Sequence, residues 1–353
     1  MAKGKLLLGL DIGSSSAKIC LLRENRGKYE IETVDRELFP VDAIVDGTIL
    51  DRMSVTRGIQ NLLTRNKVRQ KQCAIAISGY NVIVKRVRMA NMSDSELRSG
   101  VQMRWEVEQQ IPYNFDEIVY DTVVLGRNPA QNSMDILLVA VKRDVVNDYI
   151  SVAREAGLDV KVVDVASFAL QNMVETVYGE SKNGQCVGVI NIGAAVTSMT
   201  MMIDGITTFT RDITIGGNQI TEEIQKKLVV TREEAEAFKT GNTTDGAAMI
   251  PSEVEEITRR VSEMIANEIK RSLAFFYETS GDVRIRELIL CGGVVKDRTT
   301  LSILEKTLGE NIRVANPFEN LAFNSKIYTR ESLDELSLES AIAFGLALRR
   351  NVE

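Results

Sequence analysis

Histidine is entirely absent from this sequence of 353 residues. Its absence excludes serine–histidine triads, histidine-ligated zinc and an imidazole general base. Cysteine is scarce: Cys20, Cys73, Cys186 and Cys291 lie far apart, and no CxxC pair occurs. We therefore expect free thiols in the core and neither a metal site nor a disulfide framework. Any chemistry must use carboxylates, lysine, hydroxyls, backbone N–H groups or a bound ion.

Long apolar runs and a net positive charge are also missing. No stretch approaches the roughly 18 apolar residues of a membrane helix, and the start, MAKGKLLLGLDIG, lacks the pattern of a signal peptide. The formal net charge of −6 makes nucleic acid an unexpected partner. The composition is globular, with 44% hydrophobic and 26% charged residues, and the length suffices for two or three domains. We expect a cytoplasmic protein without direct membrane insertion.

A repeated glycine motif is the first positive signal. Residues 10–16 have the sequence LDIGSSS and residues 190–197 have INIGAAVT, and each lies between two apolar strands. Strand–Gly-small-small–strand predicts a β-hairpin with a tight turn free of bulky side chains. Two copies suggest two halves of similar design, although chance recurrence of a hairpin stays open on this feature alone.

Two glycine pairs add to the repeat. Gly292-Gly293 follows the apolar strand ELILC and precedes a helix from about residue 296, and Gly216-Gly217 opens the helical stretch NQITEEIQKKL. A strand–Gly-Gly–helix turn brings a backbone close to a flat ligand or a phosphate, but many α/β proteins use it for packing alone.

Helix boundaries carry recognisable signals. Ser93-x-x-Glu96 predicts a capping box, a second box beginning at Ser252 heads the longest apolar-striped helix, and Asp144 is expected to cap another. We expect Trp105, the single tryptophan, to lie in the core. Residues 88–162 follow the order helix, strand, loop, strand, helix, strand, which predicts a compact α/β unit inserted between the two hairpins.

The first turn has the groups that a nucleotide triphosphate needs. Its backbone N–H groups and hydroxyls can surround phosphates, and they come from Gly13, Ser14, Ser15 and Ser16. Asp11 can hold Mg²⁺ through its water shell, because Mg²⁺ dehydrates reluctantly. Lys18 is equally compatible with a phosphate contact and with a solvated position on the strand.

Together these motifs resemble the actin and hexokinase superfamily, to which the heat-shock chaperone ATPases also belong. Residues 11–16 are similar to its first phosphate loop, and residues 290–294 to its adenosine loop. Ala341-x-x-x-Gly345 resembles its last connecting helix. The resemblance implies ATP and Mg²⁺ as ligands. Beyond the first turn, it assigns nucleotide contacts to Asn191, Gly193, Ala194, Ala195, Thr197, Gly216, Gly217, Glu236, Lys239, Gly292, Gly293 and Val294.

Within the superfamily the early inserted unit is similar to the FtsA-type cell-division proteins and to the PilM family. FtsA-type proteins continue into a membrane-targeting amphipathic helix, whereas this sequence stops shortly after its last apolar helix. The segments VDAIVDGTILD, SDSELRSGVQMRWEVEQQIPY and GGNQITEEIQKKLVVTREEAEAFK also resemble PilM.

The PilM resemblance implies an α/β, actin-like ATPase fold with two ribonuclease-H-like domains and an FtsA-type small subdomain inserted in the first. The expected domain boundaries are 1–87 with 163–183 and 330–353 (first actin-like domain), 88–162 (inserted subdomain), 184–218 with 282–329 (second actin-like domain) and 219–281 (helical nucleoside-side subdomain).

The same resemblance implies a role in type IV pilus assembly and twitching motility. It predicts a cytoplasmic ATP-binding protein, peripheral to the inner membrane, that docks the N-terminal cytoplasmic peptide of a PilN-type inner-membrane protein. The groove is expected in the first half, beside the inserted unit. Other pilus inner-membrane and motor components, and weak self-association, stay open as further interactions.

One departure from the superfamily affects catalysis. The second phosphate loop usually begins with Asp, which helps to hold the metal and the attacking water, but here it begins with Asn191. The expected first connecting helix offers Asp164 and Ser167 but no clear catalytic Glu or Gln. No catalytic residue is therefore assigned, and we predict ATP binding with weak or absent hydrolysis.

Two other functions stay open. A small-molecule kinase of the superfamily would need an aspartate base, and Asp42, Asp46 and Asp51 lie in the appropriate region. They fit solvated loop positions equally well. A filament-forming protein like FtsA is the second alternative. Nothing in the sequence excludes self-association, and interface residues cannot be identified from one sequence.

Overall fold

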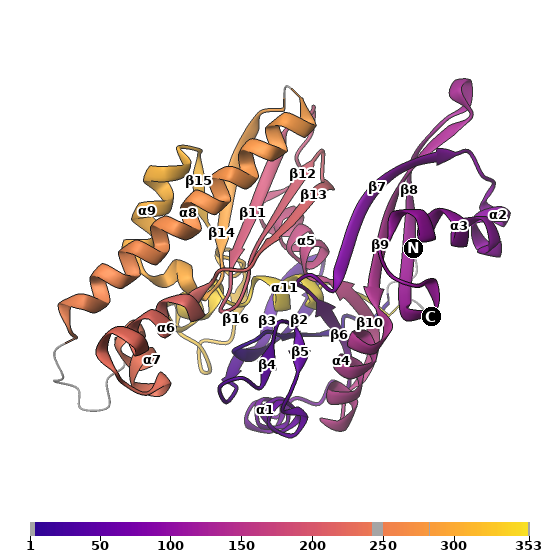
Figure 1. Cartoon of the computed structure of the whole chain (residues 1–353). Helices are drawn as coiled ribbons and strands as arrows, with labels where there is room; N and C mark the ends of the chain where they lie inside the picture. The colour runs from indigo at the N-terminus through magenta and orange to yellow at the C-terminus, as the bar shows by residue number, and fades with distance from the viewer. Residues whose placement is uncertain (1–3, 242–249, 282, 352–353) are drawn as a thin grey trace.

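The protein contains two large β-sheets, each with helices beside it, and a third small sheet that stands at one side (Figure 1). A computed structural model describes residues 4–241, 250–281 and 283–351. The mixed α/β class agrees with the prediction. All four cysteines are free and buried, which also agrees with the prediction.

The first large sheet has six strands in the order β10-β6-β1-β2-β3-β16. β1 and β2 form an antiparallel hairpin, and β6 runs parallel to β1 on its other side. All five residues of β1 are buried, because the strand has neighbours on both edges and helices on both faces. The strands are Leu8–Ile12 (β1), Ser16–Asn25 (β2), Lys28–Leu38 (β3), Gln72–Ile77 (β6), Asp159–Val165 (β10) and Ala322–Phe323 (β16).

The second large sheet has five strands in the order β13-β12-β11-β14-β15. β11 and β12 form an antiparallel hairpin and β14 runs parallel to β11, which repeats the arrangement of β1, β2 and β6. The repeated sequence motif therefore builds two halves of similar design, as predicted. The strands are Cys186–Ile192 (β11), Thr197–Ile203 (β12), Ile206–Ile213 (β13), Ile285–Cys291 (β14) and Ile312–Val314 (β15).

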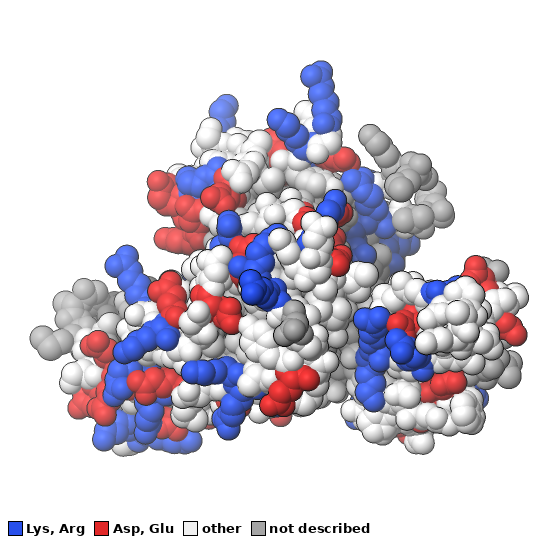
Figure 2. Space-filling view, turned by 90° about the horizontal axis from the view of Figure 1, so that it is seen from above, with Lys and Arg blue, Asp and Glu red and all other residues white. Residues whose placement is uncertain are grey.

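The third sheet, in the order β7-β9-β8, forms a separate unit with its own small core. In Figure 2 this unit stands off from the rest of the molecule across a narrow hollow. Its elements are Val82–Ala90 (β7), Asp94–Ser99 (α2), Val101–Gln110 (α3), Phe115–Glu117 (η1), Ile118–Asn128 (β8), Pro129–Gln131 (η2) and Ser133–Lys142 (β9).

The bounds of this unit differ from the predicted 88–162. β7 belongs to the third sheet and begins at residue 82, whereas β10 pairs with β6 in the first large sheet. Helix α4, Arg143–Glu155, packs its apolar side into the core beneath that same sheet. β16 was predicted in the second half, but it pairs with β3 of the first sheet. The positions of β10 and β16 are decided by pairing with strands that are distant in the sequence. Such pairing leaves no local signal in the sequence.

Two connecting helices lie between the large sheets, namely α5, Ala166–Tyr178, and α11, Ala341–Ala347 (Figure 1). A Cβ on Gly345 would lie 1.8 Å from the backbone oxygen of Ala169, and a Cβ on Gly9 would lie 2.0 Å from that of Ala343. Only glycine allows these approaches. The predicted small-residue helix therefore packs directly against α5 and β1, and it joins the two halves.

The remaining helices cover the outer faces of the sheets. α1 and α4 lie under the first sheet, and α6, α8 and α9 lie against the second. The predicted apolar stripe of α8 is buried from Val254 to Phe276. These elements are Ile44–Val45 (β4), Thr48–Ile49 (β5), Arg52–Arg65 (α1), Gly217–Leu228 (α6), Arg232–Thr240 (α7), Ser252–Ser280 (α8), Gly293–Lys296 (η3), Arg298–Leu308 (α9) and Arg330–Ser337 (α10).

Three local predictions were wrong. Ser252 is the first helical residue of α8 and makes no cap, because Pro251 occupies the N-cap position. Asp144 lies inside the first turn of α4, whose N-cap residue is Lys142. Trp105 is 59% exposed, because Gly100 adopts a left-handed conformation and breaks the expected continuous helix into α2 and α3. The predicted capping box at Ser93 is confirmed.

Candidate functional site

Two tight turns with the same hydrogen bond stand at the tips of the two central hairpins. The Gly13 amide donates to the Ser16 carbonyl at 3.0 Å, and the Gly193 amide donates to the Val196 carbonyl at 3.0 Å. Each bond leaves a two-residue tip, as the repeated Gly-small-small motif predicts. The two halves therefore present equivalent turns at the same end of their sheets.

The tips of the turns carry backbone donors that the rest of the protein does not use. Within the described ranges, no hydrogen bond is recorded from the amides of Ser14, Ser15, Ala194 or Ala195. Ser15 is exposed and Ser14 is partly exposed, whereas Ser16 is buried as the first residue of β2. Unpaired N–H groups on a turn without bulk are suited to an anionic ligand such as a phosphate.

Lys18 and Asp11 form a mostly buried ion pair beneath the first turn. Lys18 Nζ lies 3.4 Å from Asp11 Oδ2, and the two side chains are only 12% and 11% exposed. Lys18 Nζ also lies 2.9 Å from the position that a Cβ on Gly13 would occupy. Of the two roles considered for Lys18, the solvated strand position is therefore wrong. Its contact with phosphate stays a prediction, as does the hold of Asp11 on Mg²⁺.

The buried thiol of Cys291 contacts the strand that leads into the second turn. Its Sγ donates to Asn191 Oδ1 at 3.6 Å. Burial raises the pKa of the Cys291 thiol, and the negative charge of Asp11 raises it further. Asp11 precedes the first turn and Asn191 precedes the second, so the thiol contacts the strand of the second turn and is close enough to Asp11 for that charge to affect its pKa.

Helix α6 starts directly on the second turn. The amide of Gly217 donates to the Gly193 carbonyl at 3.0 Å, and that of Asn218 donates to the Ala194 carbonyl at 2.7 Å. A Cβ on Gly216 would lie 2.5 Å from the Gly193 oxygen. The predicted glycine pair therefore serves a close backbone approach that fixes the carbonyls of the turn and leaves its tip amides free.

Glu236 and Lys239 lie on α7 beside the start of α6. Lys239 Nζ is 2.6 Å from Glu236 Oε2 and 2.9 Å from the Thr221 hydroxyl. Burial lowers the pKa of Lys239, and Glu236 opposes that effect. A Cβ on Gly217 would lie 3.6 Å from Lys239 Nζ and 3.0 Å from a methyl of Val294. Three of the predicted nucleotide-binding segments therefore meet at the start of α6.

The third glycine site follows β14 and touches the strand of the second turn. Gly292 has φ +96°, and a Cβ there would lie 2.3 Å from the Ile192 carbonyl oxygen, so only glycine fits. A Cβ on Gly293 would lie 3.4 Å from a carboxylate oxygen of Glu339. The predicted adenosine loop is thereby placed against β11 and the segment that leads into α11.

Asp164 and Ser167, which were considered for catalysis, and Thr197, which was predicted to contact the nucleotide, are all buried or paired side chains. The buried Thr197 hydroxyl donates to the Ile215 carbonyl at 2.7 Å. Asp164 is paired with Arg349 at 2.6 Å. The Ser167 hydroxyl is buried with no hydrogen-bond partner in the described part of the chain. None of these groups is a carboxylate base available to a water molecule at the second turn.

The three aspartates considered for a kinase also have structural roles. Asp51 is the N-cap of α1 and accepts hydrogen bonds from the Ser54 amide and hydroxyl, which lower its pKa. Asp46 occupies the β4–β5 turn with a positive φ. Asp42 lies 4.0 Å from Arg232.

Glu339 belongs to the site but was missed in the sequence. It accepts hydrogen bonds from Arg36 Nη1 at 2.5 Å and pairs with Lys296 Nζ at 2.6 Å. Burial alone would raise the pKa of Glu339, but Lys296 and Arg36 hold it below its usual range. Arg36 lies on β3 of the first sheet, whereas Lys296 lies beside the adenosine loop of the second half. No local motif marks an ion pair between residues so far apart.

Neither a side-chain cluster suited to a metal ion nor a helix able to cross a membrane occurs in the described residues. No group of three or more acidic or cysteine side chains could hold a metal ion by itself. No helix there combines the length and apolar character needed to cross a bilayer. A divalent ion at this site would therefore need oxygen ligands from the nucleotide or from water as well as Asp11.

Comparisons with known proteins agree with this geometry. The family model described as type IV pilus assembly protein PilM matches residues 9–351. A solved structure of a PilM–PilN type IV pilus biogenesis complex is similar to the chain, with a TM-score of 0.85, 27% identity and coverage of 99% of both chains.

More distant similarities extend over most of the chain. The cell division protein FtsA of Streptococcus pneumoniae is 23% identical over 98% of this chain and 84% of its own length. The ethanolamine utilization protein EutJ of Carboxydothermus hydrogenoformans has a TM-score of 0.57 at 15% identity, covering 98% of this chain and 89% of its own. With the family match, these similarities confirm the predicted actin-like fold.

Proposed function

The chain belongs to the PilM family of type IV pilus assembly proteins, and we propose that it acts there as an ATP-binding clamp that docks a membrane protein. The observation that carries this proposal is the pair of equivalent turns, one in each half, whose tip amides are unpaired in the described part of the chain. This arrangement suits a ligand with several adjacent negative charges.

Mg²⁺-ATP would supply the phosphate charges that join the two turns. Ser14 and Ser15 would donate from the first half, and Ala194 and Ala195 from the second. Lys18 would balance phosphate charge beneath the first turn, and Asp11 would hold Mg²⁺ through water. Lys239 and Glu236, with the loop at Gly292, would border the nucleoside. Closure around the nucleotide would thus bring the two large sheets together.

Hydrolysis should be slow, because the second turn lacks a carboxylate base. Asn191 accepts a hydrogen bond from Cys291 and has no proton-accepting carboxylate, and Asp164 is neutralised by Arg349. We expect a single-turnover rate well below about 1 s⁻¹, the lower end of typical enzyme turnover. A faster rate would identify the protein as an ordinary ATPase or kinase.

The partner we propose is the N-terminal cytoplasmic peptide of a PilN-type inner-membrane protein, which would hold the chain at the membrane. Its docking surface would be the face of the third sheet opposite α2 and α3, which Figure 1 shows turned toward the rest of the molecule. The sheet register places Val84, Val139, Val119 and Val123 on this face. Val119 and Val123 are 41% and 58% exposed, so apolar surface is available to an extended peptide.

A direct test uses a fluorescent PilN-type N-terminal peptide and two matched variants. Val123→Asp places a charge on the proposed docking face and should weaken peptide binding by roughly tenfold or more, because the carboxylate would be desolvated. Val229→Asp makes the same change at a position that is 90% exposed at the end of α6, and it should bind like the wild type. Equal affinity of both variants would exclude this face.

A further inference from the structure

A groove of about 980 Å³ lies at the end of the first sheet opposite the two turns. It is bordered by the chain before β1, the far end of the β2–β3 hairpin, the loop after α1 and Tyr328. The first turn follows β1, whereas the groove includes Leu6 just before it, so about 20 Å of extended strand separates them. The third sheet also leaves β6 at the opposite end, so this groove is separate from both proposed sites.

Positive charge dominates the groove although the whole chain has a net charge of −6. Six cationic side chains and two carboxylates, Glu24 and Glu32, line it, and the positive excess is reduced by Asp35 and Glu37, which pair with Arg65. The cationic side chains are Lys5, Arg23, Arg65, Lys67, Arg69 and Arg350. A local excess of this kind attracts an anionic partner and steers its approach.

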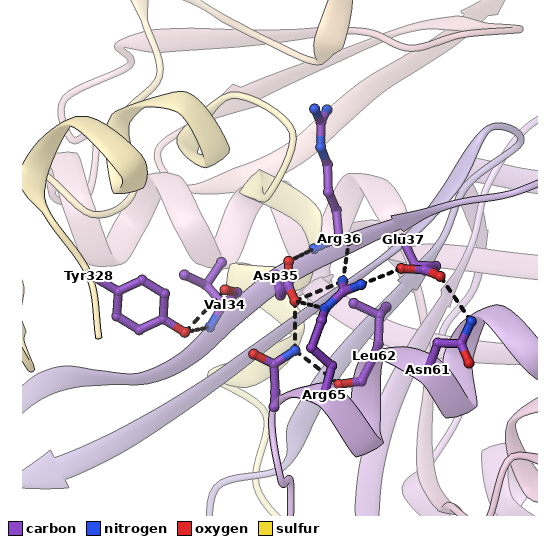
Figure 3. A network of polar contacts seen from close by, with 9 residues as sticks. Val34, Asp35, Arg36, Glu37, Asn61, Leu62, Arg65 and Tyr328 are labelled. Atoms are coloured by element: carbon purple, nitrogen blue, oxygen red, sulfur yellow. Dashed lines mark hydrogen bonds and ion pairs between the residues drawn. The ribbon is translucent and has the colours of Figure 1, made fainter. Parts of the chain in front are cut away.

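Part of this charge is held in place by the protein itself. Arg65 reaches back to Asp35 and Glu37 at 2.9 and 2.7 Å, as Figure 3 shows. Arg350 pairs with Glu24 at 2.8 Å. The Tyr328 hydroxyl is fixed by the backbone of Val34 on the same strand (Figure 3). One wall of the groove is therefore built from side chains with defined positions.

Other cations in the groove are available for a ligand. No ion pair or side-chain hydrogen bond is recorded for Lys5, Lys67 or Arg69 among the described residues, and all three are exposed. Lys67 has φ +51°, in a loop fixed by the bond from its amide to the Thr64 carbonyl at 3.1 Å. The loop after α1 thus holds two unpaired cations at the edge of the groove.

Part of the floor of the groove is apolar. Leu6, Leu21 and Leu22 are at most 8% exposed, whereas Ile327 at the rim is 63% exposed. A concave floor that is partly apolar and is bordered by cations suits a ligand that has both aliphatic and acidic side chains. A bilayer surface is broad and would not enter the groove, whereas an extended peptide presents alternate side chains to such a floor and its borders.

We propose that this groove binds an extended acidic segment of a protein partner, with aliphatic side chains against Leu21 and Ile327 and carboxylates beside Lys5, Lys67 and Arg69. The partner differs from the membrane peptide proposed above, so the protein would hold one partner on the third sheet and another at the far end of the first sheet. This inference does not depend on nucleotide binding.

The test measures anisotropy of a fluorescein-labelled ten-residue peptide of alternating glutamate and leucine. Lys67→Glu with Arg69→Glu should lower its affinity by roughly tenfold, because two favourable charge contacts become repulsive. Lys226→Glu with Lys227→Glu, an equal charge change on exposed residues of α6, is the matched control and should leave affinity nearly unchanged. Raising the salt concentration should weaken wild-type binding and reduce the difference between the variants.

Ile327→Ser checks the apolar part of the groove without changing its charge, and it should also weaken peptide binding. Circular dichroism of every variant shows whether the fold is kept. If the groove double variant and the control double variant lost the same affinity for the peptide, net charge alone would explain the effect, and the proposal would be overturned. The proposal would also be overturned if the groove variant no longer floated with anionic phosphatidylglycerol vesicles but still bound the peptide like the wild type.

Discussion

At the scale of single residues, the second turn depends on two glycines, which have no side chain. Gly216 and Gly292 both approach carbonyl oxygens of the chain around the turn, at Gly193 and Ile192. A Cβ at either position would lie closer to oxygen than van der Waals contact allows. The geometry that leaves the tip amides unpaired therefore rests on two glycines.

Gly216→Val should distort the second turn. We expect the free energy of unfolding to fall by about 1–3 kcal/mol, the usual range for overpacking, and ATP affinity to fall with it. Urea denaturation and calorimetric titration with Mg²⁺-ATP measure the two effects. Gly126→Ala is the control, because nothing lies within 4 Å of a Cβ there. Normal ATP affinity in folded Gly216→Val would remove the second turn from the nucleotide site.

Asp212 should make stability depend on pH. Burial raises the pKa of its carboxyl to about 6, although the Gly79 amide opposes the shift. Between about pH 4 and pH 6 the folded protein keeps this proton while the unfolded chain loses it, so stability falls as pH rises. Asp212→Asn should remove that decline and stabilise the protein by about 1–2 kcal/mol at pH 7. Urea denaturation at pH 4, 5, 6 and 7 measures it, and parallel curves for both proteins would contradict the assignment.

At the scale of elements, Glu339 joins parts that the chain separates widely. Its carboxylate binds Arg36 on β3 and Lys296 in η3, beside the segment that leads into α11. The contact ties a strand of the first sheet to the adenosine loop of the second half. It is therefore a candidate for controlling how the two halves sit together.

Glu339→Gln should loosen this connection. The variant leaves two cations without their anion, and because both are about one-third exposed we expect a loss of only about 1–3 kcal/mol. The pKa of Glu339 is lowered, so the difference should be present at neutral pH and shrink as pH falls below about 4.5. Glu305→Gln, on the exposed side of α9, should change stability little. If both variants lost the same free energy of unfolding, Glu339 would have no special role in joining the two halves.

The elements also show what the sequence could predict. Both hairpins and the stripe of α8 follow from local patterns, glycine beside small residues and apolar residues at helical spacing, and these were correct. Helix starts were less predictable, since Pro251 and not Ser252 takes the cap position. β10 pairs with β6 and β16 pairs with β3, and each partner lies more than 80 residues away in the chain. No local sequence pattern encodes such pairing.

The site divides in the same way. Gly216, Gly292 and Lys239 were found because glycine pairs and a Glu-x-x-Lys spacing are visible in sequence, and they meet in space. Glu339 was missed because its role arises from burial and from charges brought close only by folding. The burial of Lys18 against Asp11 likewise required the β1–β2 register, which pairs these two residues directly.

At the scale of the whole molecule, α5 and α11 join two similar halves. The turns proposed to bind nucleotide lie on one side, and the proposed peptide-binding surfaces lie elsewhere. If closure around ATP moves the halves, then the third sheet, which is carried by β6 of the first half, changes its surroundings too. Nucleotide and membrane peptide would then share one set of conformations, and each would alter the affinity of the other by the same factor.

The affinity of the PilN-type peptide, measured by anisotropy without nucleotide and with saturating Mg²⁺-ATP, tests this central claim. The account predicts that ATP changes the dissociation constant at least about fivefold, the lower end of ordinary coupling between sites. The same factor should appear when ATP affinity is measured with and without peptide. A dissociation constant that stays the same while ATP is demonstrably bound would contradict the claim, and ATP would then be a structural ligand only.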